Sequence, residues 1–389
     1  MKKVNSQTTP IYRNSGFCFA SPEDIQDAMA TPSIDRADSQ WTYSRYENPT
    51  VDSAERRLAG LEGGGYALLA PSGMAAIDIA LSIFQKGTGT NKWMFFSELY
   101  GGTSKYINNV LIQRRGIDAV WINTEARVSG TAKMLEKAFA EHKPDLIYFE
   151  SITNPMLTVP EAETIIRMAR EAGVRVVVDN TFASPLLWKP LTDGADVVVH
   201  SATKYLAGHG DLMAGYLATN EKALWESAHD YRQFCGYIIS PDDAYRLETY
   251  LQSFDCRMNC HIGNALRLAH FLTSNNSKIE SVIYPGLPGD ASHANAVKLF
   301  GEKGYGAIIT FKLSGQERVQ RRENLKKFAE IVAGRINIVP TLGNPVTTML
   351  PVNEYWIDKA TDEGLIRLSV GTEPYEIIEK TIKEALDSI

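Results

Sequence analysis

The middle of the chain alternates between apolar runs and an amphipathic segment, and this alternation most limits the fold. The runs at 145–150 (DLIYFE) and 174–180 (VRVVVDN) have the length and residue types of buried strands. Between them, EAETIIRMAREAG at 161–173 places apolar residues at helical spacing and ends at a glycine. A third strand begins within 195–206. Strands connected through helices lie parallel and are covered on both faces, so we predict an α/β fold with a large, mostly parallel sheet.

The regions on either side of this alternation predict further elements. Residues 1–50 carry turn formers and aromatic residues without strong periodicity, which favours an extended N-terminal arm. Helical spacing at 51–64 and 72–84 predicts two helices, the second with Ser72 as its N-cap. One long helix is expected over 241–274. The other expected elements are strands at 305–313 and 365–370, and helices over 320–334 and at the end of the chain.

These elements divide the chain into three predicted parts. We expect an arm over 1–50 that contacts a partner subunit, a large α/β domain over 51–240 and a smaller C-terminal α+β domain over 241–389. The length of 389 residues agrees with two or three domains, because a domain usually contains about 100–200 residues.

Charge and hydrophobicity argue against several classes of protein. The chain has 40 Lys and Arg against 46 Asp and Glu, a net charge of −6, whereas nucleic-acid and anionic-membrane binding ask for clustered positive charge. The sequence contains no apolar run of about 18 residues, which a membrane span requires. Its start lacks the apolar segment of a secretory signal. We therefore expect a cytoplasmic protein without nucleic-acid or membrane partners.

The four cysteines predict neither a disulfide framework nor a metal site. Cys18, Cys235, Cys256 and Cys260 are too few for a disulfide-stabilised fold of this length. Cys256 and Cys260 are four residues apart in a predicted helix, but no second pair of metal ligands lies nearby. We expect these two to be thiols of the core and expect no bound metal.

Polar residues follow each of the three central strands. Ligands of open α/β sheets bind just beyond the carboxyl ends of parallel strands, so these residues should converge on one edge. They are Glu150 and Asn154 after the first strand, Asp179 and Asn180 at the second, and Ser201, Thr203 and Lys204 after the third.

A lysine and an acid at this edge indicate a particular chemistry. Most lysines are solvated, but Lys204 follows a buried strand, where burial lowers the pKa of an amine and makes it a nucleophile. Asp179 ends the preceding strand. A lysine that forms a Schiff base, together with an aspartate that faces a pyridinium nitrogen, is the pattern of pyridoxal phosphate (PLP) sites. The helix opened by Ser72, Gly73 and Met74 could bind the phosphate, although such residues taken alone more often cap a helix without a ligand.

Longer blocks of sequence resemble the PLP-dependent enzymes of cysteine and methionine metabolism. The blocks occur in the order and spacing of that family from about residue 8 to the C-terminus. The resemblance implies PLP fold type I (aspartate-aminotransferase-like), PLP as cofactor and a homo-oligomer, with a dimer completing the active site and a tetramer expected. The strongest blocks are YSRYENPT (43–50), SGMAAI (72–77), VVVDNTFASP (176–185), VVVHSATKYLAGHGD (197–211) and GLIRLSVGTE (364–373).

The resemblance also implies a role for each site residue. Lys204 would form the Schiff base and move the proton at the substrate Cα, and Asp179 would face the pyridine nitrogen. Tyr100 would stack on the ring and assist departure of the leaving group. Of the remaining residues, Gly73, Met74, Ser201 and Thr203 would bind the phosphate, joined by Tyr43 and Arg45 of a second copy, Asn154 would touch the ring hydroxyl, and Arg367, Thr341 and Tyr43 would bind the substrate.

The choice among reactions depends on a few positions. Relatives that handle cystathionine tend to carry a Glu where this chain has Thr42 and Pro340, so cystathionine is disfavoured. GHGD at 208–211 is similar to methionine γ-lyase, although that enzyme has a Cys at the position of Gly102. We expect γ-elimination from a methionine-like amino acid, which gives a 2-oxo acid, ammonia and the leaving group. The alternatives are γ-replacement on an activated homoserine, an oxygen- or nitrogen-linked leaving group, and a PLP-binding protein without catalysis.

Overall fold

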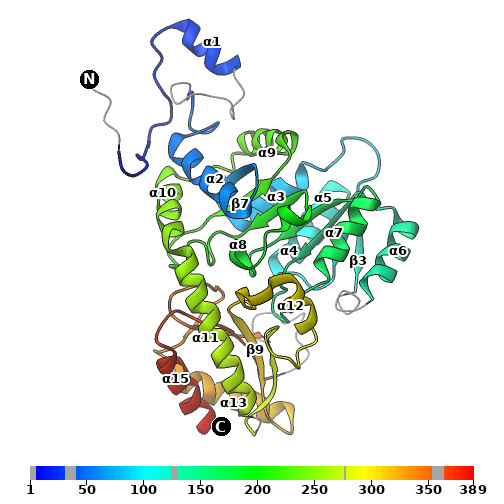
Figure 1. Cartoon of the computed structure of the whole chain (residues 1–389), viewed down its shortest axis with the longest axis vertical. Helices are drawn as coiled ribbons and strands as arrows, with labels where there is room; N and C mark the ends of the chain where they lie inside the picture. The colour runs from blue at the N-terminus through cyan, green and yellow to red at the C-terminus, as the bar shows by residue number, and fades with distance from the viewer. Residues whose placement is uncertain (1–5, 31–40, 124–129, 276, 353–362) are drawn as a thin grey trace.

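A large sheet of seven strands forms the centre of the upper half of the molecule (Figure 1). The structure is a computed structural model and describes residues 6–30, 41–123, 130–275, 277–352 and 363–389. All neighbouring pairs in this sheet are parallel except the two pairs made by β7. The prediction of a large, mostly parallel sheet is confirmed. The strand order is β1 (Tyr66–Ala70), β7 (Gly215–Thr219), β6 (Val197–His200), β5 (Arg175–Asp179), β4 (Leu146–Glu150), β2 (Lys92–Phe96) and β3 (Asp118–Ile122).

Helices cover both faces of this sheet because its central strands are apolar on both sides. Val176 and Val178 of β5 belong to the core that also contains Ile165, whereas Val177 belongs to the core that contains Ile79. Successive side chains of a strand point to opposite faces, so each face needs its own helices. The first core includes α2 (Pro49–Glu62) and α7 (Ala162–Glu171), and the second includes α3 (Gly73–Ser82) and α9 (Lys222–Cys235).

A second, five-stranded sheet lies in the lower half, beside the long helix α11 (Figure 1). Its pairs are antiparallel apart from the short pair at one edge. The order is β10 (Asn337–Ile338), β11 (Thr348–Pro351), β12 (Leu365–Ser369), β9 (Ile308–Leu313) and β8 (Ile279–Ile283). The helices around it are α11 (Phe254–Ser274), α12 (His293–Phe300), α13 (Arg318–Val332) and α15 (Tyr375–Asp387).

Shorter elements complete the described chain. Most of them connect strands of the large sheet, and α1 lies at the top of Figure 1. They are α1 (Pro22–Ala30), α4 (Gly101–Tyr106), the π-helix η2 (Ile107–Ile112), α5 (Gln113–Arg115), α6 (Thr131–His142), α8 (Ser184–Leu187), α10 (Pro241–Tyr250), and the 3₁₀ turns η4 (Pro190–Asp193), η5 (Leu251–Ser253) and η6 (Gly301–Lys303).

Two expectations about helices are corrected. The segment 241–274 is not one helix, because the turn η5 separates α10 from α11. At this break, Arg257 Nη2 donates to the Tyr250 carbonyl oxygen at 3.0 Å, and Arg257 Nε donates to Ser253 Oγ at 3.1 Å. A 3₁₀ turn changes the side-chain spacing only slightly, so the apolar pattern did not reveal it.

The N-terminal arm is also not extended throughout, since it contains α1. Asp24 N donates to Ser21 Oγ at 3.2 Å, while Ser21 N donates to Asp24 Oδ2 at 3.0 Å. This reciprocal cap satisfies two backbone donors at the start of the helix, a signal that the sequence carried. The contact of the arm with a partner subunit, and the predicted domain limits, stay predictions.

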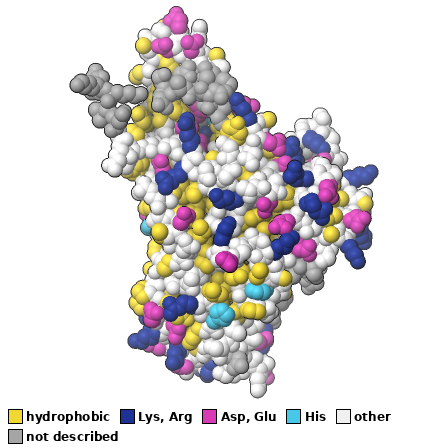
Figure 2. Space-filling model, in the orientation of Figure 1, with side chains coloured by type: hydrophobic (Ala, Val, Ile, Leu, Met, Phe, Trp, Pro, Cys, Tyr) yellow, Lys and Arg dark blue, Asp and Glu magenta, His cyan; other side chains and the backbone are white. Residues whose placement is uncertain are grey.

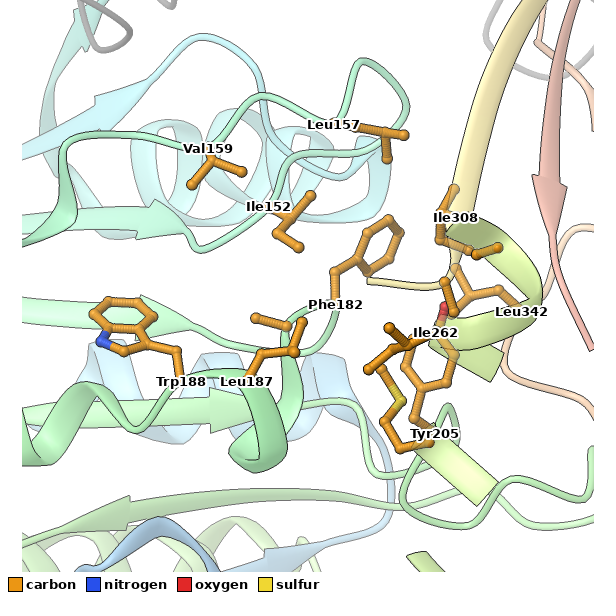
Figure 3. Close-up of a cluster of buried hydrophobic side chains, with 14 of the residues drawn as sticks. Ile152, Leu157, Val159, Phe182, Leu187, Trp188, Tyr205, Ile262, Ile308 and Leu342 are labelled. Carbon is orange, nitrogen blue, oxygen red and sulfur yellow. The ribbon is translucent and has the colours of Figure 1, made fainter. Parts of the chain in front are cut away.

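One continuous hydrophobic core joins the two sheets (Figure 3). Ile152 and Phe182, which follow β4 and β5, belong to the same buried cluster as Ile262 of α11, Ile308 of β9 and Leu342. In a tightly packed interior, the position of one element constrains the positions of the elements packed against it. The cluster therefore fixes the small sheet against the carboxyl ends of the large one.

The surface carries mixed charges. On the face shown in Figure 2, dark blue basic and magenta acidic side chains are interspersed. Within the described part of the chain, no helix has both the length and the apolar character needed to cross a membrane.

Candidate active site

A cavity of about 220 Å³ lies where the large sheet meets the small one. It is open at the carboxyl ends of β4, β5 and β6, as expected for a ligand site of an α/β sheet. Most of the predicted site residues line it together. They are Gly73, Met74, Tyr100, Asn154, Asp179, Ser201, Thr203, Lys204 and Arg367.

Lys204 lies in the turn that follows β6, and its amine faces the small-sheet side of the cavity. Lys204 Nζ donates to Thr341 Oγ1 at 2.9 Å. Burial, and secondly the positive charge of Arg367, lower the pKa of Lys204 to about 8. An amine with this pKa is partly unprotonated near neutral pH and is therefore a competent nucleophile and base.

Arg367 is held in the middle of β12 with its side chain buried, at 3% exposure. Arg367 Nη1 donates to Asn154 Oδ1 at 3.1 Å, and Nη2 donates to the carbonyl oxygen of Thr341 at 3.2 Å. The guanidinium thus connects the loop after β4 with the loop that carries Thr341. Its planar donors at the cavity wall suit a carboxylate ligand.

Asp179 ends β5 and is held by two donors. Thr181 N donates to Asp179 Oδ1 at 3.0 Å, and the Tyr148 hydroxyl donates to Oδ2 at 3.2 Å. Burial raises the pKa of Asp179, and these hydrogen bonds act against that effect. A cation at the cavity end of this carboxylate would favour its charged form.

Close backbone contacts at the N-terminus of α3 create a cradle that requires glycine. Ser72 caps the helix by accepting from Ala75 N at 3.2 Å, which confirms the predicted N-cap. A Cβ at Gly73 would lie 2.7 Å from the Ser201 Cβ, and a Cβ at Gly215 would overlap the Ser72 carbonyl. The helix start therefore lies directly against the turn after β6. Its backbone N–H groups and dipole favour an anion at that point.

Two predicted residues make contacts that the sequence did not indicate. The Thr203 hydroxyl donates to the carbonyl oxygen of Ala214 at 3.1 Å and accepts from Ala214 N at 3.0 Å, so it is engaged within the protein. Tyr100 N donates to Glu150 Oε1 at 2.5 Å, and the Tyr100 ring, 39% exposed, lies so close to Gly102 that a Cβ there would overlap it.

Tyr43 and Arg45 lie away from this cavity. They line a separate hollow beside the arm, where Arg45 Nη1 donates to the Gln233 carbonyl oxygen at 3.1 Å and its guanidinium lies 4.7 Å from the Tyr46 ring centre. Both side chains are exposed. The expectation that they serve a second copy of the chain stays a prediction.

Several residues that position the site escaped sequence analysis. Gly343, with φ of 80°, lies so close that a Cβ would be 2.9 Å from the carbonyl carbon of Lys204. Arg257 Nη1 and Nη2 donate to the carbonyl oxygens of Tyr205 and Leu206, just after Lys204. Ser201 N donates to Thr181 Oγ1 at 2.9 Å and ties β5 to β6. Of these residues that sequence analysis missed, only Thr181 had a local sign of its role, because it directly follows the polar pair Asp179–Asn180 at the end of a predicted strand.

The expectation about the cysteines needs one correction. All four are free, and Cys256 and Cys260 are exposed on α11 rather than part of the core, because they lie on the solvent side of that amphipathic helix. Among the described residues, no group of three or more His, Cys, Asp and Glu side chains is placed to hold a metal ion.

The groups around the cavity fit PLP. Gly73 and Gly215 let the N-terminus of α3 pack directly against the turn after β6, and the backbone N–H groups and dipole of that helix start suit a phosphate. Asp179 offers a carboxylate to a pyridinium nitrogen, and Lys204 offers an amine with a lowered pKa to an aldehyde.

Comparison with known proteins agrees with this chemistry. The sequence pattern of the Cys/Met metabolism PLP-dependent enzymes matches residues 1–387. Cystathionine gamma-lyase of Bacillus subtilis (strain 168) is 34% identical over 354 residues, 90% of this chain and 89% of that protein. L-methionine gamma-lyase of Fusobacterium nucleatum subsp. polymorphum is 32% identical over 98% of this chain and 92% of its own length.

The fold agrees as well. The solved structure of cystathionine gamma synthase from Xanthomonas oryzae pv. oryzae, in complex with aminoacrylate and cysteine, matches with a TM-score of 0.84 and 29% identity, over 98% of this chain and 93% of that one. The chain therefore belongs to the Cys/Met metabolism PLP-dependent enzyme family, a family of lyases and synthases, with PLP fold type I and PLP as its cofactor.

Proposed function

We propose that this enzyme catalyses γ-elimination from a methionine-like amino acid and releases a 2-oxo acid, ammonia and the leaving group. The observation that carries this proposal is the apolar lining beside Lys204. Pro340 and Leu342, on either side of the Thr341 that accepts from Lys204 Nζ, line the cavity, as does Met213. An apolar wall favours an uncharged γ-substituent such as a thioether, and it offers no partner to the distal ammonium of cystathionine.

Each residue of the site has a separate role in the proposed reaction. Arg367 binds the substrate carboxylate with its fork of N–H groups, helped by Thr341, and fixes the Cα beside Lys204. PLP, when bound, supplies an electron sink for negative charge at Cα. Lys204 holds the cofactor through its amine and then carries the proton at Cα. Asp179, which lines the cavity, would hold the protonated ring nitrogen of bound PLP.

The remaining site residues hold the cofactor in place. The N–H groups at Gly73 and Met74, together with Ser201, bind the phosphate, and Thr203 supports this turn through Ala214. Asn154, already fixed by Arg367, would contact the ring hydroxyl of bound PLP, and Tyr100 would cover the ring. Tyr43 and Arg45 complete the phosphate site of a second copy, and Tyr43 also borders its substrate. Activity therefore requires a dimer.

A second candidate is γ-replacement on an activated homoserine. It is favoured by the likeness to a cystathionine gamma synthase over nearly the whole chain. Both reactions begin with proton removal at Cα, and they differ in whether a nucleophile or water completes the turnover. The relatives named cystathionine lyases make cystathionine a necessary third substrate in the test.

One assay separates these reactions. The purified holoenzyme is offered methionine, then O-acetylhomoserine with sulfide, then cystathionine, and 2-oxobutanoate and homocysteine are measured. We expect 2-oxobutanoate from methionine. Homocysteine from O-acetylhomoserine and sulfide, without any oxo acid from methionine, would overturn the lyase proposal.

The cavity lining provides a matched variant. Pro340→Glu places a carboxylate where cystathionine's distal ammonium would need a partner. An added charge-assisted hydrogen bond is worth about 1.5–3 kcal/mol, so the ratio of kcat/KM for cystathionine over methionine should rise at least about tenfold. Leu342→Met, which keeps the wall apolar, serves as the control.

A further inference from the structure

A buried acid and a buried histidine lie behind the cofactor site and have no part in the roles given so far. Glu62, the last residue of α2, and His200, the last residue of β6, are 0% and 2% exposed. His200 Nε2 and Glu62 Oε1 are 2.5 Å apart. Such burial is costly for a carboxylate, so the contact needs an explanation.

The surroundings of this pair indicate where the charges lie. The Tyr216 hydroxyl donates to Glu62 Oε1 at 3.2 Å, and the His200 ring stacks on the Tyr216 ring at 4.6 Å. Glu62 Oε2 has no hydrogen-bond partner among the described residues. An ionised Glu62 can only accept, so beside it His200 Nε2 is the donor. A buried carboxylate with so few donors is stabilised by a neighbouring positive charge, which His200 would supply with protons on both ring nitrogens.

The position of His200 connects this charge to the site. Asp179 is paired in register with Val199, the residue before His200, and the hydrogen bond from Ser201 N to Thr181 Oγ1 ties the two strand ends together. Burial is the largest influence on Asp179 and raises the pKa of its carboxyl, whereas the nearby charge of His200 lowers it. Glu62, His200 and Tyr216 thus contact one another, and the charge of His200 acts on Asp179, whose carboxylate also accepts from the Tyr148 hydroxyl.

We propose that Glu62 and His200 form a positioning pair that keeps a positive charge behind the site and thereby keeps the Asp179 carboxylate ionised toward the cofactor's ring nitrogen. The inference rests on the role of Asp179 given under the proposed function. It does not depend on whether the enzyme eliminates or replaces the γ-substituent.

The test measures the dissociation constant of PLP from the apoenzyme as a function of pH. Below the fall in affinity near pH 8 that protonation of Lys204 causes, affinity should fall a second time at acid pH as Asp179 becomes protonated, and this second fall is called the acid limb. Without the charge of His200, protonation of Asp179 begins at higher pH. In Glu62→Gln and in His200→Gln, the acid limb should therefore shift upward by about one pH unit, since an opposite charge nearby shifts a carboxyl pKa by about 1–3 units. Glu62→Asp, which keeps the charge, should restore the original limb.

A control is available on the same helix. Glu55 of α2 is also buried, and its Oε1 accepts from Leu69 N at 2.7 Å and from Arg232 Nη1 at 2.5 Å. Glu55→Gln removes a buried charge of the same kind without touching His200, so it should lower the thermal stability and leave the acid limb in place. An unmoved limb in both pair variants, or an equal shift in Glu55→Gln, would overturn the proposal.

Two further measurements keep the result unambiguous. Asp179→Asn should remove the acid limb. If it does not, the role of Asp179 fails, whereas a limb that is lost in Asp179→Asn but unmoved in the pair variants refutes only the pair.

In wild-type protein labelled with ¹⁵N-histidine, the signal of His200 is assigned by the shift that Tyr216→Phe causes. His200 should carry protons on both ring nitrogens at pH 7. A neutral imidazole would contradict the inference even if the pair variants fail to fold.

Discussion

The two walls of the cavity are built in different ways. Asp179, Ser201 and Lys204 occur where parallel strands end or directly after them, so the topology of the large sheet brings them together. Arg367 and Thr341 come instead from the middle of an antiparallel strand and from a loop. Arg367 reaches the cavity, and Thr341 reaches Lys204, only because the small sheet is packed against the large one. The first wall follows from chain topology and the second from packing between sheets.

The largest effect should come from the large-sheet wall. Lys204→Ala removes both the amine that holds the cofactor and the base, so turnover should fall by about 10³-fold or more. Release of 2-oxo acid measures it, and the yellow colour of the holoenzyme should disappear. Lys105→Ala, at an exposed lysine of α4, is the control and should keep both. Persistence of the colour in Lys204→Ala would show that another residue holds PLP.

A smaller effect is expected from the opposite wall. Arg367→Lys keeps a charge but loses the planar fork, so kcat/KM should fall by roughly 10–100-fold, mainly through KM. Measuring kcat/KM of Arg367→Lys and of wild type on the amide of the substrate tests whether the loss comes from the contact with the substrate carboxylate. Because the amide lacks the carboxylate, variant and wild type should nearly converge on it. An undiminished difference would mean that Arg367 acts on the fold rather than on the substrate.

The pH dependence of PLP attachment should depend on both walls, because Lys204 belongs to one wall and Arg367, which lowers its pKa, belongs to the other. The pKa of Lys204 is lowered to about 8 by burial and by Arg367, so below pH 8 the amine is protonated and cannot attack an aldehyde. Covalent incorporation of PLP into the apoenzyme, trapped with borohydride and measured by mass spectrometry, should rise about tenfold per pH unit up to about pH 8 and then level off. Arg367→Met removes a positive charge and should move this midpoint upward. A rise that continues to the ordinary lysine pKa of about 10.4 would contradict the shift.

The smallest effect should appear where the walls touch. Gly343→Ala places a Cβ 2.9 Å from the Lys204 backbone at a positive φ, so the free energy of unfolding should fall by about 1–3 kcal/mol. Gly263→Ala in α11 meets nothing within 4 Å and should instead stabilise the helix by about 0.5–1 kcal/mol. Denaturant unfolding of both variants measures the difference. Equal effects would mean that the contact between the walls carries no strain.

The sequence by itself determined the elements that local physics controls. Buried parallel strands show as continuous apolar runs, and helix starts show as caps, so 145–150, 174–180 and Ser72 were predicted close to their observed places. The rule that ligands bind at strand ends then grouped Asp179, Ser201 and Lys204. Arg367, by contrast, was assigned by resemblance alone, because an arginine within an apolar strand gives no sign of what it faces.

Tertiary structure decided everything that depends on contact between distant segments. The 3₁₀ break at 251–253, the hydrogen bonds of Arg257 to the turn after Lys204, and the approach of Gly343 join residues far apart in the chain. The contact between Glu62 and His200 spans 138 positions. Periodicity reports which face of an element is buried but not which partner buries it. For this reason the sequence specified the chemistry of the site, while only the packed fold determined how its charges are held.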